Sequence, residues 1–287
     1  MLKKYYQLAK PGIIFGNLIS TLGGFFLAAR GDWSLDLLAS ITLGTSALVG
    51  SGCIINNYID KDIDALMTRT QNRFLVCGYF NKLIIFSYAA ILAIMGCLIL
   101  AIGCNLLTLF LGIIGFIVYI FAYTLWLKRR STWNTAIGSI AGAMPPVMGY
   151  CAVTNQWDLG ACLLFLIFAL WQIPHHYAIG IYRLQDYQKA GVAALPVVKG
   201  IKVTFLHIKV TLILFTLSSM ALSFYGYTGK VYLFSTLCIN LLWLKTAFAQ
   251  MEPQAKAKKL FLLSIWVVCL QSAMMAFNPI SSTILKE

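Results

Sequence analysis

Long apolar runs separated by short polar stretches dominate this sequence. Each run has the length of about 20 residues that a helix needs to cross a bilayer. Lipid offers no partner for backbone polar groups, and the runs are unbroken rather than alternating, so they predict helices and not the strands of a barrel. The runs lie at 12–29, 35–56, 83–102, 105–127, 134–153, 159–181, 203–224, 231–250 and 260–278. We therefore predict an all-α polytopic membrane protein with nine transmembrane helices, forming a single domain over 1–287.

The composition supports an integral membrane protein whose direct environment is the lipid bilayer. Hydrophobic residues make up 60% of the chain and charged residues only 11%. The net charge of +13 could indicate nucleic-acid binding, but the basic residues punctuate the apolar runs instead of forming one patch. No nucleic-acid partner is expected. The eight cysteines lie mostly inside apolar runs without metal-ligand or paired spacing, which predicts reduced, packed thiols.

The distribution of lysine and arginine predicts the orientation. Nine helices place the two termini on opposite sides of the membrane. If the N-terminus is cytoplasmic, all but three of the 22 lysines and arginines fall on the cytoplasmic side, and the exceptions are Arg30, Lys230 and Lys286. This orientation places the most acidic stretch of the chain in the cytoplasm, where soluble diphosphates and magnesium are found.

That acidic stretch, NNYIDKDIDALMTRTQNR at 56–73, holds three of the nine acids of the chain. If the preceding helix continues through it, Asn56, Asp60 and Asp64 share one face, and Asp62 does not. Magnesium is held by a few carboxylates and completes its shell with water and substrate phosphates. The spacing predicts a magnesium-diphosphate site at the membrane edge, with a solvated acidic loop as the alternative.

Basic residues near this stretch are candidates for contact with phosphate. Arg69 and Arg73 follow directly, and arginine forms charge-assisted bonds to phosphate oxygens. Lys128 and Arg129 follow the run at 105–127, where an aromatic belt with topology charges is an equally good interpretation. Asn17, inside the first run, either touches substrate or bonds a neighbouring helix.

The run at 159–181 carries the second group of candidate residues. Gln172, His175 and His176 are polar groups near the cytoplasmic end of an apolar helix, and such groups tend to face a cavity. Each histidine has three open interpretations: an iron ligand, a base, or a bond to a neighbouring helix. Asp186 follows and is the predicted second anchor for the metal-bound diphosphate. Lys189 and Lys199 are either leaving-group contacts or topology charges.

The motifs of the chain resemble those of the UbiA superfamily of intramembrane prenyltransferases. The NNYIDKDID element at 56–64 carries the superfamily pattern. KPGIIFGN at 10–17, WQIPHHYAI at 171–179 and LPVVKG at 195–200 resemble the branch that farnesylates haem. The second acidic motif differs, because the superfamily usually shows two acids where this chain has Asp186.

This resemblance implies a fold, a reaction and a set of partners. It implies a UbiA-type bundle in the cell inner membrane with its active site facing the cytoplasm. A farnesyl group from farnesyl diphosphate would alkylate a vinyl group of haem B, and water addition would give haem O. Mg²⁺ would be held by Asn56, Asp60, Asp64 and Asp186. A haem A synthase or a terminal oxidase is a candidate protein partner.

Two alternative functions are also compatible with the sequence. A UbiA-type transferase could use a quinone-precursor aromatic acid as acceptor. A transporter would also suit nine helices with prolines and polar groups inside them, although such proteins often show paired internal repeats that this sequence lacks.

Overall fold

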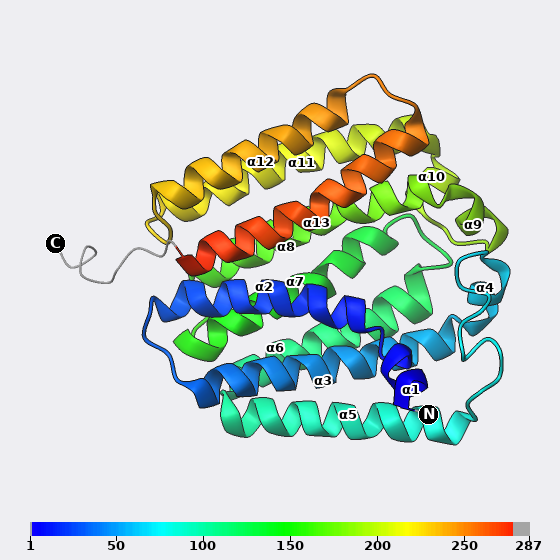
Figure 1. Cartoon of the computed structure of the whole chain (residues 1–287), viewed down its shortest axis with the longest axis horizontal. Helices are drawn as coiled ribbons and strands as arrows, with labels where there is room; N and C mark the ends of the chain where they lie inside the picture. The colour runs from blue at the N-terminus through cyan, green and yellow to red at the C-terminus, as the bar shows by residue number, and fades with distance from the viewer. Residues whose placement is uncertain (1, 278–287) are drawn as a thin grey trace.

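The long helices of the computed structural model, which describes residues 2–277, follow the apolar runs of the sequence (Figure 1). Within the described residues nine helical spans are long and apolar enough to cross a membrane, as predicted. They are α2 (Pro11–Ala29), α3 (Leu35–Ile59), α5 (Lys82–Gly103), α6 with η1 (Leu106–Leu127), α7 (Asn134–Thr154), α8 (Leu159–Tyr182), α11 (Gly200–Phe224), α12 (Lys230–Phe248) and α13 (Pro253–Phe277).

The last of these helices begins earlier than the predicted boundary at residue 260. Its first turn is capped by the Glu252 carboxylate, which accepts the backbone N–H groups of Gln254 and Ala255. The same bonds lower the pKa of Glu252. Lysines in the first two turns hid this start from a hydropathy argument, although Lys256 is buried and donates to the carbonyl of Ala249. The predicted end at residue 278, like Lys286, lies outside the described residues.

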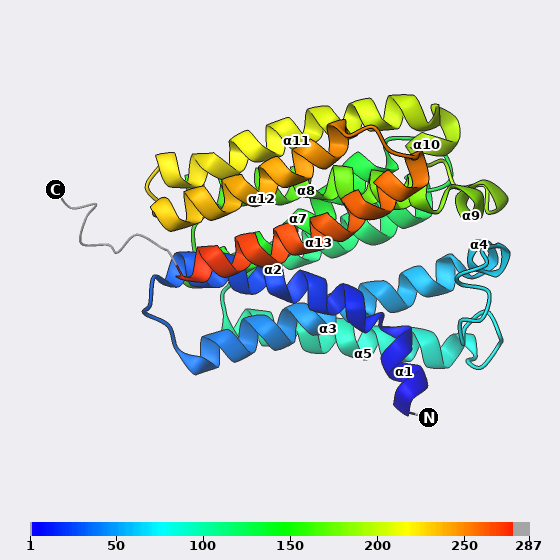
Figure 2. The ribbon, with the colours of Figure 1, turned by 45° about the horizontal axis from the view of Figure 1, so that its top comes forward.

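Four short helices were not predicted, because each is too short to produce an apolar period. Figures 1 and 2 show them gathered at one end of the bundle. They are α1 (Leu2–Leu8), α4 (Lys61–Leu66), α9 (Leu184–Lys189) and α10 (Leu195–Val198). This end of the molecule therefore carries more ordered structure than the sequence alone suggests.

Helix α7 forms the centre of the bundle and packs against α2, α6 and α8, while α13 contacts both α2 and α8. The approach of α2 to α7 depends on glycine. A Cβ at Gly24 would overlap the carbonyl oxygen of Pro146, and one at Gly149 would overlap that of Thr21. Small residues allow such close approach, which compensates for the weak hydrophobic driving force between helices in lipid.

The fourth span ends in a π-helix, η1 (Val118–Leu127). Its backbone hydrogen bonds join residues five positions apart, as in the bond from the Lys128 N–H to the Tyr123 carbonyl at 2.9 Å. π-Helical turns often occur at functional sites because they re-aim side chains. Here the turn packs against α3 and directs Lys128 toward the acidic stretch.

Candidate functional site

Asn56, Asp60 and Asp64 share one face across the joint between α3 and α4. The Asp60 N–H donates to the Asn56 carbonyl at 2.9 Å, and the Asp64 N–H donates to the Asp60 carbonyl at 2.8 Å. The four-residue hydrogen-bond spacing therefore continues although α3 ends at Ile59. All three side chains are buried, whereas the Asp62 side chain is 64% exposed. The helical spacing thus produces the arrangement that the sequence predicts.

A chain of polar contacts fixes Asn56 and Asp60. Lys10 Nζ donates to Asn56 Oδ1 at 2.5 Å, and Asn56 Nδ2 donates to Asp60 Oδ2 at 2.8 Å. Lys128 forms an ion pair with the same carboxylate oxygen. Burial lowers the pKa of Lys10 to about 8, so this lysine remains largely charged at neutral pH.

The second carboxylate of the array, Asp64, pairs with Arg73, which also donates to Asn57 Oδ1 at 3.1 Å. Beside this pair lies a cavity of about 380 Å³, which we call the basic cavity. Three cationic side chains line it, from Lys10, Arg69 and Arg73. Its size and charge suit an anion as large as a diphosphate.

Asp186 lies on α9, next to the segment that follows α4. Its Oδ1 accepts the backbone N–H of Thr68 at 3.0 Å, across 118 positions of sequence. The carboxylate is nine-tenths buried. Figure 2 shows α4 and α9 adjacent at the same end of the bundle. The two acidic segments therefore meet.

The donor set suits a hard cation such as Mg²⁺, which prefers carboxylate and amide oxygens. Asp60 Oδ1 is buried and has no hydrogen-bond partner within residues 2–277, and an orphaned buried acceptor of this kind is open to a cation. Over the same residues, no three His, Cys, Asp or Glu side chains are gathered as a metal-binding group. Lys128 and Arg73 pair with Asp60 and Asp64 instead, so a metal ion would exchange with these cations.

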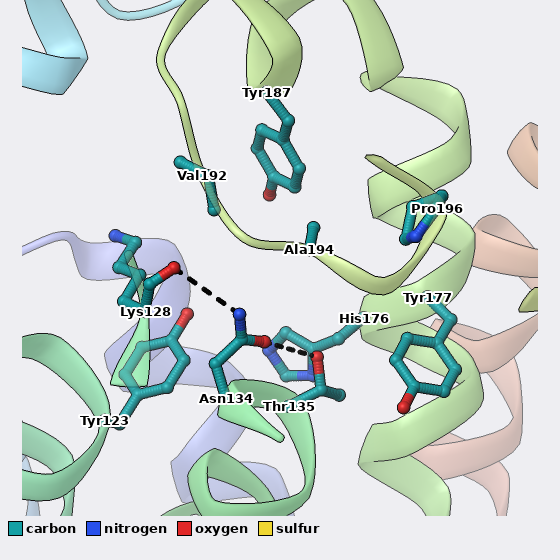
Figure 3. A pocket seen from close by; sticks show the side chains of 10 residues that line it. All are labelled: Tyr123, Lys128, Asn134, Thr135, His176, Tyr177, Tyr187, Val192, Ala194 and Pro196. Carbon is teal, nitrogen blue, oxygen red and sulfur yellow. Dashed lines mark hydrogen bonds between the residues drawn. The ribbon is translucent and has the colours of Figure 1, made fainter. Parts of the chain in front are cut away.

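The two histidines of α8 have different surroundings. His175 Nδ1 lies 2.6 Å from the hydroxyl of Ser264 on α13, and its ring stacks on Trp171. His176 Nδ1 lies 2.8 Å from the Gln172 carbonyl, and its ring lines a small cavity beside Lys128 (Figure 3). His175 thus links two helices, whereas His176 faces open space.

The remaining predicted substrate contacts lie in less distinctive positions. Asn17 Nδ2 donates to the Ile13 carbonyl of its own helix at 2.8 Å, and Gln172 is buried where a side chain at Gly142 would overlap its amide. Arg129 holds both oxygens of Asp62 at 2.6 Å, and these bonds lower the pKa of Asp62. Lys189 and Lys199 are exposed.

Lys10 is the residue of this site that the sequence argument treated only as a topology charge. It precedes Pro11 and adopts a left-handed backbone conformation with φ of 54°. That conformation is unusual for a residue with a side chain. The signal available from the sequence was its place at the start of the KPGIIFGN motif, next to a helix-starting proline.

Comparison with known proteins identifies the family of the chain. The chain matches the UbiA prenyltransferase family over residues 17–268. It is 47% identical over 290 residues to the protoheme IX farnesyltransferase of Yersinia pseudotuberculosis serotype O:1b (strain IP 31758), covering 99% of this chain and 98% of that protein. It is 48% identical to the Photorhabdus laumondii protein of the same name, covering 97% of this chain and 96% of the relative.

Solved structures show the same fold at low sequence identity. A structure described for digeranylgeranylglyceryl phosphate synthase superimposes with a TM-score of 0.77 at 18% identity, covering 96% of this chain and 99% of that one. A UbiA homolog from Archaeoglobus fulgidus, bound to DMAPP and Mg²⁺, superimposes with a TM-score of 0.69 at 15% identity, covering 95% and 99%. With a family match over most of its length, this chain belongs to the UbiA prenyltransferase family and is a multi-pass membrane prenyltransferase.

Proposed function

We propose that this protein transfers the farnesyl group of farnesyl diphosphate to a vinyl group of haem B, with addition of water, to give haem O. The choice of haem B as acceptor and farnesyl diphosphate as donor is based on sequence identity. The chain is 47% identical, over nearly its whole length, to proteins named protoheme IX farnesyltransferase. The buried Asn56, Asp60 and Asp64 face beside the basic cavity supports the diphosphate chemistry.

The carboxylates of both acidic segments would hold magnesium. Asp60, with its orphaned Oδ1, Asp64 and Asp186 are the proposed ligands, together with Asn56. The bound ion would offset the negative charge that grows on the diphosphate as the allylic carbon–oxygen bond breaks. The family relative solved with DMAPP and Mg²⁺ is consistent with this assignment.

The cations of the site bind and orient the leaving group. Lys10, Arg69 and Arg73 line the basic cavity, and Lys128 reaches Asp60 from η1. A diphosphate offers Arg73 and Lys128 an alternative anionic acceptor, which would free the Asp60 and Asp64 carboxylates for the metal ion. Arg129 bonds Asp62 on α4, and Lys189 and Lys199 end α9 and α10 at the same end of the bundle, so all three would contribute to the attraction of the anion.

Aromatic rings near this point suit the cation that remains after the diphosphate leaves. Tyr119 and Tyr123 stack with ring centroids 5.9 Å apart, and Lys128 Nζ lies 5.8 Å from the Tyr123 ring centroid. The negative face of an aromatic ring stabilises a nearby cation.

The protein would work in the cell inner membrane with this site facing the cytoplasm. The excess of lysine and arginine on the side of α4 and α9 supports that orientation. Membership of a transferase family disfavours the transporter alternative. A haem A synthase or a terminal oxidase remains the candidate recipient of the product.

The test is an assay of membranes that contain this chain, supplied with Mg²⁺, farnesyl diphosphate and one acceptor. With haem B, mass analysis is expected to show haem that has gained one farnesyl group and one water. With 4-hydroxybenzoate, no prenylated product is expected. Prenylation of the aromatic acid alone would favour the quinone-precursor alternative, and chelation of the metal is expected to abolish the haem product.

A further inference from the structure

A small cavity lies between η1, α7, α8 and the segment after α9 (Figure 3). Its volume of about 40 Å³ is far too small for a porphyrin but has room for about two or three waters. Polar side chains from four parts of the chain border it: Tyr123, Lys128, Thr135, His176, Tyr177 and Tyr187. A cavity of this size and lining is suited to hold ordered water.

This cavity is next to the proposed ionisation site. Lys128 both borders the cavity and pairs with the Asp60 carboxylate. Thr135 donates its hydroxyl proton to Asn134 Oδ1 at 3.0 Å, so its oxygen can accept a hydrogen bond from water. Asn134 Nδ2 is held by the Ala193 carbonyl at 2.9 Å, which fixes the cavity wall.

The hydrogen bond of His176 determines which of its nitrogens can accept a proton. Nδ1 lies 2.8 Å from the backbone carbonyl of Gln172, which can only accept. Nδ1 therefore carries the hydrogen, and Nε2 of the neutral ring carries a lone pair. The His176 side chain is exposed and borders the cavity.

His175 is not placed to accept a proton from water in the small cavity. Ser264 donates its hydroxyl proton to the Phe261 carbonyl, so its oxygen accepts from His175 Nδ1. The His175 ring lies between Trp171 and Phe261, with centroid distances of 4.8 and 5.3 Å, and does not border the small cavity. It holds α8 against α13.

We infer that His176 Nε2 is the general base that removes a proton from a water held in the small cavity, as that water adds to the porphyrin side chain. This inference rests on the proposed haem farnesylation. The farnesyl carbon–oxygen bond breaks with its electron pair leaving on diphosphate, and the terminal vinyl carbon bonds the farnesyl carbon. The cation left on the carbon next to the porphyrin bonds the water oxygen, and the water proton passes to Nε2.

Removal of this base changes which product forms. A cation that meets no activated water loses a proton from its neighbouring carbon instead. The product is then an alkene that lacks one water relative to the hydroxylated product. The ratio of alkene to hydroxylated product therefore reports on water activation, independently of the rate of farnesyl transfer.

The test compares this ratio for purified wild-type protein, His176→Ala and His176→Gln, with farnesyl diphosphate and haem B as substrates. His207→Ala on α11 is the matched control, because His207 is an exposed histidine outside the small cavity. We expect the ratio to rise at least about tenfold in both His176 variants, as for loss of a general base, and to stay unchanged in the control. His175→Ala is expected to lower total product at an unchanged ratio.

Each outcome decides the matter. An unchanged ratio in both His176 variants overturns the inference. The absence of any farnesylated product from folded variants, whose unfolding temperature equals that of the wild type, also overturns it. If His176→Ala does not fold, His176→Gln decides alone, since its amide can bond water but cannot accept the proton. Absence of farnesylated haem with the wild-type chain would instead contradict the proposed function.

Discussion

Asp60 and Asp62 are two positions apart, yet the fold gives their carboxylates opposite environments. Asp60 is buried between Asn56 and Lys128 and keeps one oxygen without a partner among residues 2–277. Asp62 points outward, and both of its oxygens are occupied by Arg129. An exposed pair of this kind contributes only about 0–1 kcal/mol to stability.

We predict that Asp60→Asn lowers the rate of farnesyl transfer at least about a hundredfold, since it weakens the binding of the ion that would offset the charge on the leaving diphosphate. Asp62→Asn, the matched control, should change this rate less than about threefold, as expected for a surface ion pair. Product formation at saturating substrate and metal measures both. Equal losses in the two variants would contradict the roles assigned here.

A second prediction concerns Lys10, which donates to Asn56 and lines the basic cavity. Lys10→Met should raise the KM for farnesyl diphosphate by about tenfold or more, the size expected for a lost charge-assisted hydrogen bond. Lys3→Met removes a charge from the exposed face of α1 and serves as control. A KM unchanged in Lys10→Met would show that this lysine only orients Asn56.

The sequence predicted some of these residues and missed others for a physical reason. The shared face of Asn56, Asp60 and Asp64 depends on the local helical period, which can be read from spacing. The contact between Lys10 and Asn56 joins positions 46 apart, and that between Thr68 and Asp186 joins positions 118 apart. Only tertiary packing brings such pairs together.

At the scale of elements, the close contact between α2 and α7 fixes the positions of the helices around the site. A Cβ at Gly149 would overlap backbone atoms of α2, which cannot rotate away as a side chain can. By contrast, a Cβ at Gly16 on α2 would meet nothing within 4 Å. The two glycines therefore differ in their tolerance of alanine.

We predict that Gly149→Ala destabilises the protein by about 1–3 kcal/mol, the usual cost of overpacking, and lowers its unfolding temperature in detergent. Gly16→Ala should leave that temperature unchanged or raise it, because alanine is the better helix former. Thermal unfolding followed by size-exclusion chromatography measures both. An unchanged unfolding temperature in Gly149→Ala would show that α2 and α7 can separate without cost.

Elements were predictable from the sequence in proportion to the length of their apolar pattern. The spans from α2 to α12 match the predicted runs within a few residues. The short helices α4 and α9 have no such pattern, and the apolar run at 105–127 does not indicate that its end is the π-helix η1. They are stabilised by contacts across the chain, such as the bond from Thr68 to Asp186, and these elements place the site.

At the scale of the whole molecule, the cations lie mainly at the end of the bundle that holds α4 and α9. This end holds Lys61, Arg69, Arg73 and the cluster at 128–130. The other end of the bundle holds Arg30, which follows α2, and Lys230, which begins α12. Translocation of basic loops is disfavoured, so the α4 and α9 end is expected to stay in the cytoplasm. Farnesyl diphosphate would then reach the basic cavity from that side.

Cysteine labelling tests this orientation, because Cys77 and Asp32 are exposed and lie in connecting segments at opposite ends of the bundle. One variant lacks all native cysteines and carries the substitution Asp32→Cys. We predict that a membrane-impermeant maleimide labels this variant when the cells are intact. A variant that keeps only Cys77 should react only after the membrane is opened. The reverse pattern would place both acidic segments outside the cell, away from soluble prenyl diphosphates, and would contradict the proposed route of the substrate.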